Sequence, residues 1–266
     1  MSLTIYIKSR GSYIDNDYHW IDENNQSVAT PESIKEIQEF IQSDARSIVL
    51  QQKETSLLLL VTGIESNRKD IQGRMIRNSI AWLKNDILGN WDDSDEDTHR
   101  KILQQIAACA LRNELDDRIN SNIIAEKGDF RVLWEEILKL KYNYSKISSL
   151  RSPDQENLTP KICKNTDKSR EELANELETT DLSRDFLVIV TGNKSEETLK
   201  KAGVWRGLSN LIPYEEWQEY EPNQQQNLEN FVEDVGEIFE GVRKEFDKFI
   251  AKSRKRNRRY RDKRNR

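Results

Sequence analysis

The stretch Leu57-Leu58-Leu59-Leu60-Val61-Thr62-Gly63 is a continuous apolar run that ends in Thr and Gly. Runs of this length, closed by a turn residue, are typical of a strand that is buried on both faces. A second run, Leu187-Val188-Ile189-Val190-Thr191-Gly192, ends in the same three residues. Both strands can simply end in turns that need glycine, or the two glycine turns can share one edge of a single mixed sheet, where ligands commonly bind. We favour one mixed sheet.

The sequence around these runs predicts further strands and helices. Strands are expected over 3–9, 18–21, 47–52, 56–62 and 185–191, and 75–83 fits either a strand or a short helix. A helix is expected to begin at Pro31, with Thr30 as its cap. Helical spacing of apolar residues continues over 95–124 and 134–140, and further helices are predicted over 169–178, 195–201 and 223–250.

These elements predict an α/β or α+β fold, with a mixed β-sheet core and helical additions. Residues 1–145 form an α/β body with a helical layer at 95–140, and the polar segment 146–169, which contains two prolines, is expected to be a loop or linker. Residues 170–250 complete the sheet and add a long amphipathic C-terminal helix. The segment 251–266 is predicted to be a disordered basic tail.

Composition points to a soluble protein with a polar surface. Hydrophobic residues make up 35% of the chain and charged residues 33%. No apolar run approaches the roughly 20 residues that span a bilayer, and residues 1–10 alternate instead of forming a signal peptide core. Two cysteines give no disulfide framework and fit a reduced, cytoplasmic location. Cys109 is predicted to be buried on a helix, whereas Cys163 is predicted to be exposed in the polar segment.

Basic side chains are concentrated at the end of the chain. Residues 252–266 hold ten of the 42 basic residues and one of the 47 acids, which leaves 32 basic residues against 46 acids in residues 1–251. The net charges are therefore +9 and −14. A polyanion, most naturally nucleic acid, is the expected partner of such a segment, although basic termini also associate without specificity. The residues expected to contact phosphates, with one ring to stack on a base, are Arg254, Lys255, Arg256, Arg258, Arg259, Tyr260, Arg261, Lys263, Arg264 and Arg266.

A second cluster of basic residues surrounds Gly73. Arg68, Arg74 and Arg77 are candidates for binding an anion through guanidinium groups and exposed backbone N–H groups. The alternative is a solvated loop whose arginines pair with surface acids, with Asp70 orienting Arg68 or Arg74. Neither a Walker A motif nor a Gly-x-Gly-x-x-Gly motif occurs, so nucleotide hydrolysis is not expected.

No pattern in the sequence identifies a catalysed reaction. The acids of 92–97 could hold Mg²⁺ or Ca²⁺, but a helix N-terminus, where Ser94 or Asp95 serves as cap, explains them without a metal. A pair of Cys163 with His19 or His99 lacks a local signature. No catalytic residue, metal ligand or cofactor is assigned. The aromatic residues Trp205, Tyr214, Trp217 and Tyr220, with Arg206, predict either core packing or a stacking patch on the surface.

The segments 5–11, 18–20 and 68–77, together with the charged tail, give the chain a general resemblance to accessory subunits of bacterial defence operons. The resemblance assigns a role to no residue. The charged tail and the lack of a catalytic pattern lead us to expect a non-enzymatic adaptor subunit of a multi-protein system, contacting nucleic acid through its tail and a protein partner through its body, without membrane association. Two alternatives remain: a metal-dependent nuclease or phosphoesterase using Asp70 or 92–97, and a homo-oligomeric scaffold assembled through the C-terminal helix.

Overall fold

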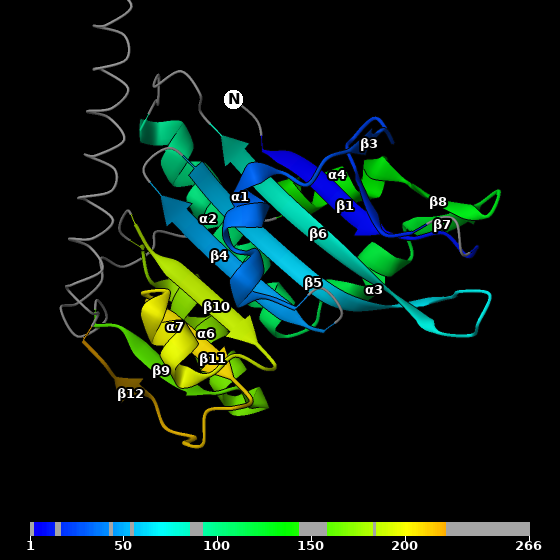
Figure 1. The fold of residues 1–266 in the computed structure, drawn as a ribbon. Helices are drawn as coiled ribbons and strands as arrows, with labels where there is room; N and C mark the ends of the chain where they lie inside the picture. The colour runs from blue at the N-terminus through cyan, green and yellow to red at the C-terminus, as the bar shows by residue number, and fades with distance from the viewer. Residues whose placement is uncertain are drawn as a thin grey trace, which may run out of the picture. The chain divides into compact units, whose positions relative to one another are not determined.

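A computed structural model describes residues 3–13, 17–42, 45–53, 56–85, 93–143, 159–182 and 185–221 (Figure 1). The helix expected over 223–250 and the basic tail lie outside the described residues. The first part of the chain forms β1 (Thr4–Ser9), β2 (His19–Ile21), β3 (Ser27–Val28), α1 (Glu32–Glu36), the 3₁₀ helix η1 (Gln38–Phe40), β4 (Ser47–Lys53), β5 (Ser56–Lys69) and β6 (Met75–Asn85). The middle part forms α2 (Asp93–Leu111), α3 (Asp116–Asn120), β7 (Ile123–Glu126), β8 (Asp129–Val132) and α4 (Trp134–Asn143). The last part forms β9 (Lys161–Lys164), α6 (Asp167–Thr179), β10 (Leu187–Thr191), α7 (Glu196–Lys201), β11 (Arg206–Ser209) and β12 (Gln218–Glu219).

One mixed sheet organises the described residues. Its ten strands follow the order β12-β9-β11-β10-β4-β5-β6-β1-β2-β3. The strands from β4 to β3 are all antiparallel to their neighbours, whereas β9, β11 and β10 are parallel. β4 pairs antiparallel with β10 and joins the two halves. The predicted mixed sheet with helical additions is confirmed for this part of the chain.

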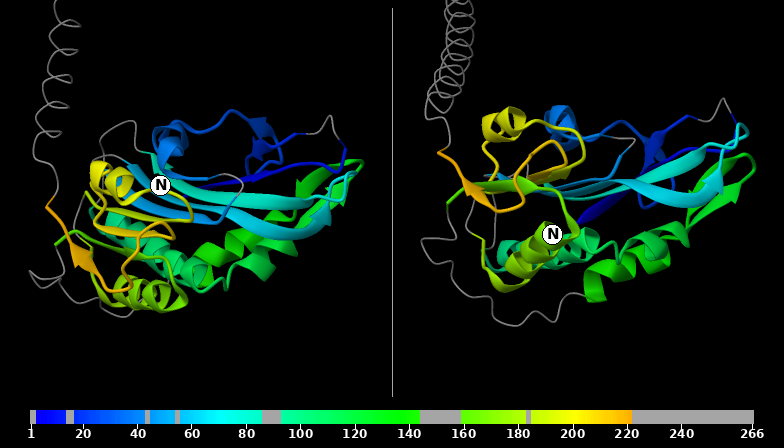
Figure 2. Two further views of the ribbon diagram at one scale, coloured as in Figure 1. Left: turned by 60° about the horizontal axis from the view of Figure 1, so that its bottom comes forward. Right: turned by 90° about the horizontal axis from the view of Figure 1, so that it is seen from below.

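Both faces of the sheet are covered, as the continuous apolar runs predict (Figure 2). Leu57, Leu59 and Val61 of β5 pack in the core beneath α2, α4 and α6, whereas Leu58 and Leu60 pack in the opposite core beneath α1 and α7. Successive side chains of a strand point to opposite faces, so only a fully apolar run can bury both. No helix among the described residues is long and apolar enough to cross a membrane.

The two Val-Thr-Gly sequences lie at the same level of the sheet. Ile48 of β4 pairs with Val61 on one side and with Val190 on the other. Gly63, however, does not end its strand, because β5 continues to Lys69 after a register shift next to Gly63. Gly63 has a φ of 67°, and a Cβ there would lie 2.2 Å from the carbonyl carbon of Ala45. Glycine is thus required for a bulge and a close backbone approach.

Several elements differ from the sequence predictions. The helical pattern over 95–124 is interrupted after Leu111, and its end lies in the hairpin β7–β8, whose turn residues Lys127 and Gly128 both have positive φ. Residues 75–83 belong to a strand. Pro31 itself occupies the N-cap of α1, without a side-chain cap from Thr30. β9 lies within the segment whose composition predicts a loop.

Candidate functional site

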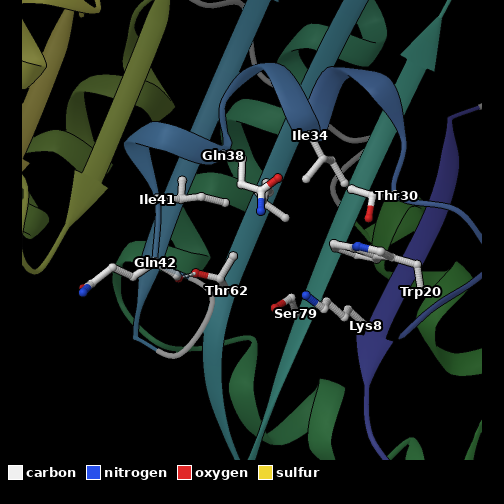
Figure 3. Close-up of a pocket in the computed structure, with 10 residues that line it drawn as sticks. Lys8, Trp20, Thr30, Ile34, Gln38, Ile41, Gln42, Thr62 and Ser79 are labelled. Atoms are coloured by element: carbon white, nitrogen blue, oxygen red, sulfur yellow. Dashed lines mark hydrogen bonds between the residues drawn. The ribbon is translucent and has the colours of Figure 1, made fainter. Parts of the chain in front are cut away.

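A pocket of about 310 Å³ opens beside α1 and η1 (Figure 3). Lys8 of β1, Ser79 of β6 and Leu60 and Thr62 of β5 form its floor, and Trp20 of β2 forms one wall. The remaining lining comes from the segment that contains α1 and η1, namely Thr30, Ile34, Gln38, Ile41 and Gln42.

Strand register explains why these floor residues meet. Lys8 pairs directly with Ser79 on β6 and with Trp20 on β2. Paired residues in an antiparallel sheet point to the same face. The neighbouring Ile7 and Ile80, which also pair with each other, point to the opposite face and join the core beneath α2. The alternation of side chains therefore places Lys8, Ser79 and Trp20 in a row on the pocket face. It places Ile7 and Ile80 in the hydrophobic core on the other face.

Hydrogen bonds attach the far end of the pocket to the sheet. The Thr62 hydroxyl lies 2.7 Å from the carbonyl oxygen of Gln42 and 3.0 Å from that of Ala45. The Gln42 backbone N–H donates to the Ser47 hydroxyl at 3.2 Å. The chain that follows η1 is thus held against β4 and β5, and the pocket is preformed.

Among the ten described residues that line the pocket, Lys8 is the one with a charged side chain. Its Nζ also lies 5.9 Å from the centre of the Tyr18 ring. The other polar lining groups are hydroxyls, amides and the Trp20 indole, and most of them can donate hydrogen bonds. The lining therefore favours a ligand with negative charge.

The three arginines of the predicted anion site engage three different sets of partners. Arg74 Nε donates to Asp70 Oδ2 at 2.7 Å, and Arg77 Nη2 donates to Glu65 Oε1 at 3.2 Å. Both interactions agree with the alternative of a solvated loop whose arginines pair with acids. Arg68 instead turns inward from β5.

Arg68 belongs to a partly buried polar network. Its guanidinium donates to the Ser9 hydroxyl, to Asn78 Oδ1 at 3.3 Å and to the carbonyl oxygen of Arg10 at 3.3 Å. Burial lowers its pKa, and its Cζ lies 5.7 Å from the centre of the Phe130 ring. Asn78 extends the network to Asn120, whose Oδ1 accepts a hydrogen bond at 2.9 Å. These bonds tie β1, β5, β6 and α3 together, which is a structural role.

The Asp70 carboxylate accepts hydrogen bonds within the turn between β5 and β6. Burial by itself would raise its pKa, but hydrogen bonds from the Arg74 side chain and from the backbone N–H groups of Arg74 and Gln72 lower it. A carboxylate that already accepts these bonds is poorly placed to coordinate a metal. No group of three or more potential metal ligands occurs among the described residues.

The other acids and the thiols also have structural surroundings. Asp97 pairs with Arg100 and Lys101, and the neighbouring Asp92 lies outside the described residues. Cys163 is buried, contrary to the prediction, because β11 and β12 flank its strand. Burial raises the pKa of its thiol. β9 and β2 lie near opposite edges of the sheet, seven strand spacings or roughly 34 Å apart at about 4.8 Å per spacing, so Cys163 and His19 form no catalytic pair.

The predicted aromatic group belongs largely to the core. Trp205 and Tyr220 are buried, and the Tyr220 hydroxyl donates to the carbonyl oxygen of Val204. Trp217 is partly buried and its indole N–H donates to Glu172 Oε2 at 3.0 Å. Core packing, one of the two sequence explanations, therefore accounts for most of these rings.

The pocket residues Lys8, Trp20 and Ser79 are not singled out by the sequence. The alternation of residues 3–9 shows that Lys8 points away from Ile7, but only the strand order β6-β1-β2 brings Ser79 and Trp20 beside it. The basic residues of 252–266 lie outside the described part of the chain. No protein family model, curated protein or solved structure matches this chain. The candidate site rests on the chain's own residues.

Proposed function

We propose that this chain is a non-enzymatic adaptor that binds nucleic acid through residues 252–266 and contacts a protein partner through its body. The observation that carries this proposal is the division of charge, with a net +9 on fifteen residues and −14 on the preceding 251. Phosphate neutralisation by lysine and arginine is the main source of affinity in non-specific nucleic-acid binding. The acidic body repels the same polyanion.

Ion pairs within the body support confining the contact to this segment. Its arginines are repeatedly held within 4 Å of carboxylates, so their charge is compensated locally. The pairs involve Arg10, Arg46, Arg74, Arg77, Arg100, Arg112, Arg131, Arg170 and Arg206. A phosphate approaching these groups would have to displace a carboxylate or sit close to one.

Exposed apolar side chains at the end of the hairpin β5–β6 support a protein contact. Ile71, within the turn, is 63% exposed, and Met75, the first residue of β6, is 46% exposed. Large exposed apolar side chains at the end of a hairpin favour a protein interface. A subunit that recruits nucleic acid to a larger assembly would use the two regions separately.

Deletion of residues 252–266 tests the nucleic-acid contact. Fluorescence anisotropy with labelled single-stranded DNA and RNA should show the affinity of the full chain falling about 300-fold between 50 and 200 mM salt if about six phosphates are neutralised. The deletion should abolish this salt-sensitive binding and leave the Tm almost unchanged, since the segment follows the folded body.

Two controls sharpen the experiment. Replacing the ten basic residues of the segment with Gln keeps its length and should match the deletion. The control Arg77→Gln removes an exposed arginine of the body that pairs with Glu65. It should change affinity less than about twofold, because one exposed, compensated charge contributes little.

Unchanged affinity after the deletion would refute the proposal. Product formed from the same DNA in Mg²⁺ but not in EDTA would instead favour a nuclease, and a solution mass well above 31.3 kDa would favour the oligomeric scaffold.

A further inference from the structure

We propose that the pocket beside α1 and η1 binds a small molecule that carries one anionic group on a flat or apolar body. This site is independent of nucleic-acid binding by residues 252–266. The proposal rests on the charge of the lining, on the pairing of polar and apolar walls, and on the way in which the pocket is held open.

The anionic group is assigned from the charge of the lining. Of the ten lining residues that the structure describes, Lys8 carries a charge and none is an acid. Figure 3 shows the Lys8 amine and the Ser79 hydroxyl next to each other on the floor. Ser79 is only 3% exposed, so its hydroxyl is nearly removed from bulk water. An ammonium and a hydroxyl side by side can bind one carboxylate or phosphate oxygen through charge-assisted hydrogen bonds.

The body of the ligand is assigned from the remaining walls. Trp20 reaches over the floor from β2, Ile34 adds apolar surface from α1, and Leu60 is a further apolar residue of the lining. An indole wall favours a flat ring, which it contacts through a large apolar surface. The volume of about 310 Å³ lies at the lower end of the range for small-molecule sites, so a peptide or duplex is too large.

A packing fault does not account for this pocket. Empty cavities inside proteins are ordinarily lined by apolar side chains, and lysine is rarely turned inward without a partner. Within the described part of the chain Lys8 forms no ion pair, and the Tyr18 ring, 5.9 Å from its Nζ, does not neutralise the charge. The anchored chain at Gln42 and Ala45 holds the walls apart without a ligand, which lowers the ordering cost of binding.

The test uses two anions and their neutral counterparts as probes of the full-length ¹⁵N-labelled chain. The pairs are AMP with adenosine, and indole-3-acetate with the corresponding alcohol, tryptophol. At least one anion should bind with a millimolar or tighter Kd and shift the Trp20 indole N–H signal, which is assigned with Trp20→Phe. The neutral counterpart should bind at least about tenfold more weakly.

Two lysine variants distinguish binding in the pocket from non-specific attraction of the anion to positive charge. Lys8→Gln should weaken the anion about tenfold or more and change binding of the neutral compound little. Lys35→Gln removes the same charge from the exposed side of α1, outside the pocket lining, and should change neither. If Lys8→Gln lowers the Tm strongly, the comparison of each anion with its neutral counterpart on the wild-type chain still decides.

Three outcomes would overturn the proposal: no shift of the Trp20 signal with either anion, equal affinity for charged and neutral probes, or undiminished affinity in a folded Lys8→Gln variant. The anion should also bind the chain that lacks residues 252–266 with equal affinity. Loss of binding there would assign the anion to the basic segment and refute the pocket. The deletion therefore distinguishes failure of this proposal from failure of the proposed nucleic-acid contact.

Discussion

Arg206 is a charged residue inside the fold, only 2% exposed. Its Nε and Nη2 donate to the two carboxylate oxygens of Glu176 at 2.8 and 2.5 Å. Its Nη1 donates to the carbonyl oxygens of Thr159 and Trp205 at 2.7 and 2.9 Å. The guanidinium also lies over the Trp205 ring, 4.0 Å from its centre. The buried charge is tolerated because Glu176 of α6 neutralises it and two carbonyl oxygens accept hydrogen bonds from its Nη1.

Glu176→Gln is expected to lower the free energy of unfolding by about 3 kcal/mol, because breaking a buried pair leaves an uncompensated charge. Urea unfolding measures the change. The control is Glu135→Gln, whose carboxylate is exposed on α4 and pairs with Lys139, and which should cost less than about 1 kcal/mol. Equal losses in the two variants would show that Arg206 is not held by Glu176.

Single residues show where sequence reasoning reaches its limit. Cys109 lies on the apolar face of the long helix α2, and its predicted burial is confirmed. Cys163 stands between lysines and an asparagine, so local composition predicts exposure, yet it is fully buried. Its burial comes from β11 and β12, which follow more than forty residues later. Local pattern cannot report contacts made by distant strands.

Among the elements, β5 depends on one backbone conformation. Gly63 allows the strand to shift register and still continue to Lys69. The same shift brings residues 45 and 46 against the strand, next to the anchored end of the pocket. Gly73, in the turn that follows β5, also has a positive φ, but no atom lies within 4 Å of a Cβ built there.

This pair of glycines separates conformational strain from steric conflict. Gly73→Ala should cost about 1 to 2 kcal/mol, the strain of a left-handed backbone for a residue with a Cβ. Gly63→Ala should cost about 3 kcal/mol or more, because its Cβ also meets the backbone of Ala45. Thermal or urea unfolding of both variants checks the difference. Similar losses would mean that the segment around Ala45 moves aside easily.

Element prediction succeeded where one segment carries the whole pattern. β5 and β10 contain the continuous apolar runs at 57–61 and 187–190, and burial on both faces follows from those runs alone. The hairpin β7–β8 was missed because Ile119 and Ile123 keep the four-residue spacing of a helix, although Lys127-Gly128 carries a turn signal. β9 and β11 have four residues each, too few to show a period. The pocket depends on pairing Lys8 with Ser79, which no local pattern encodes.

At the scale of the whole molecule, β4 is the junction of the sheet. It pairs with β5 through seven residues and with β10 through four. The parallel strands β10, β11 and β9 join the antiparallel half only through β4 within the sheet, while α2 and α6 pack against each other beneath it. We therefore expect the two halves to unfold as one cooperative unit only if the β4–β10 pairing is as stable as the rest of the sheet.

Native-state hydrogen exchange tests this cooperativity. The amides of β4, β5, β6 and β10 should exchange slowest and with one common free energy, that of global unfolding. The two-residue strands β3 and β12 should exchange much faster, because each lies at an edge. A markedly lower free energy for β9, β10 and β11 than for β5 and β6 would show two separate units divided at β4.

The late arrival of β10 also has a consequence for synthesis. β4 ends at Lys53, whereas its partner β10 ends at Thr191. At about 5 to 20 residues per second, a ribosome takes about 7 to 28 s to make the residues between them. During that interval the strand that finally lies inside the sheet is an outer edge with apolar side chains on both faces, the kind of surface that recruits other chains. The speed of translation through α2 to α6 therefore sets how long this edge of each nascent chain is open to other chains.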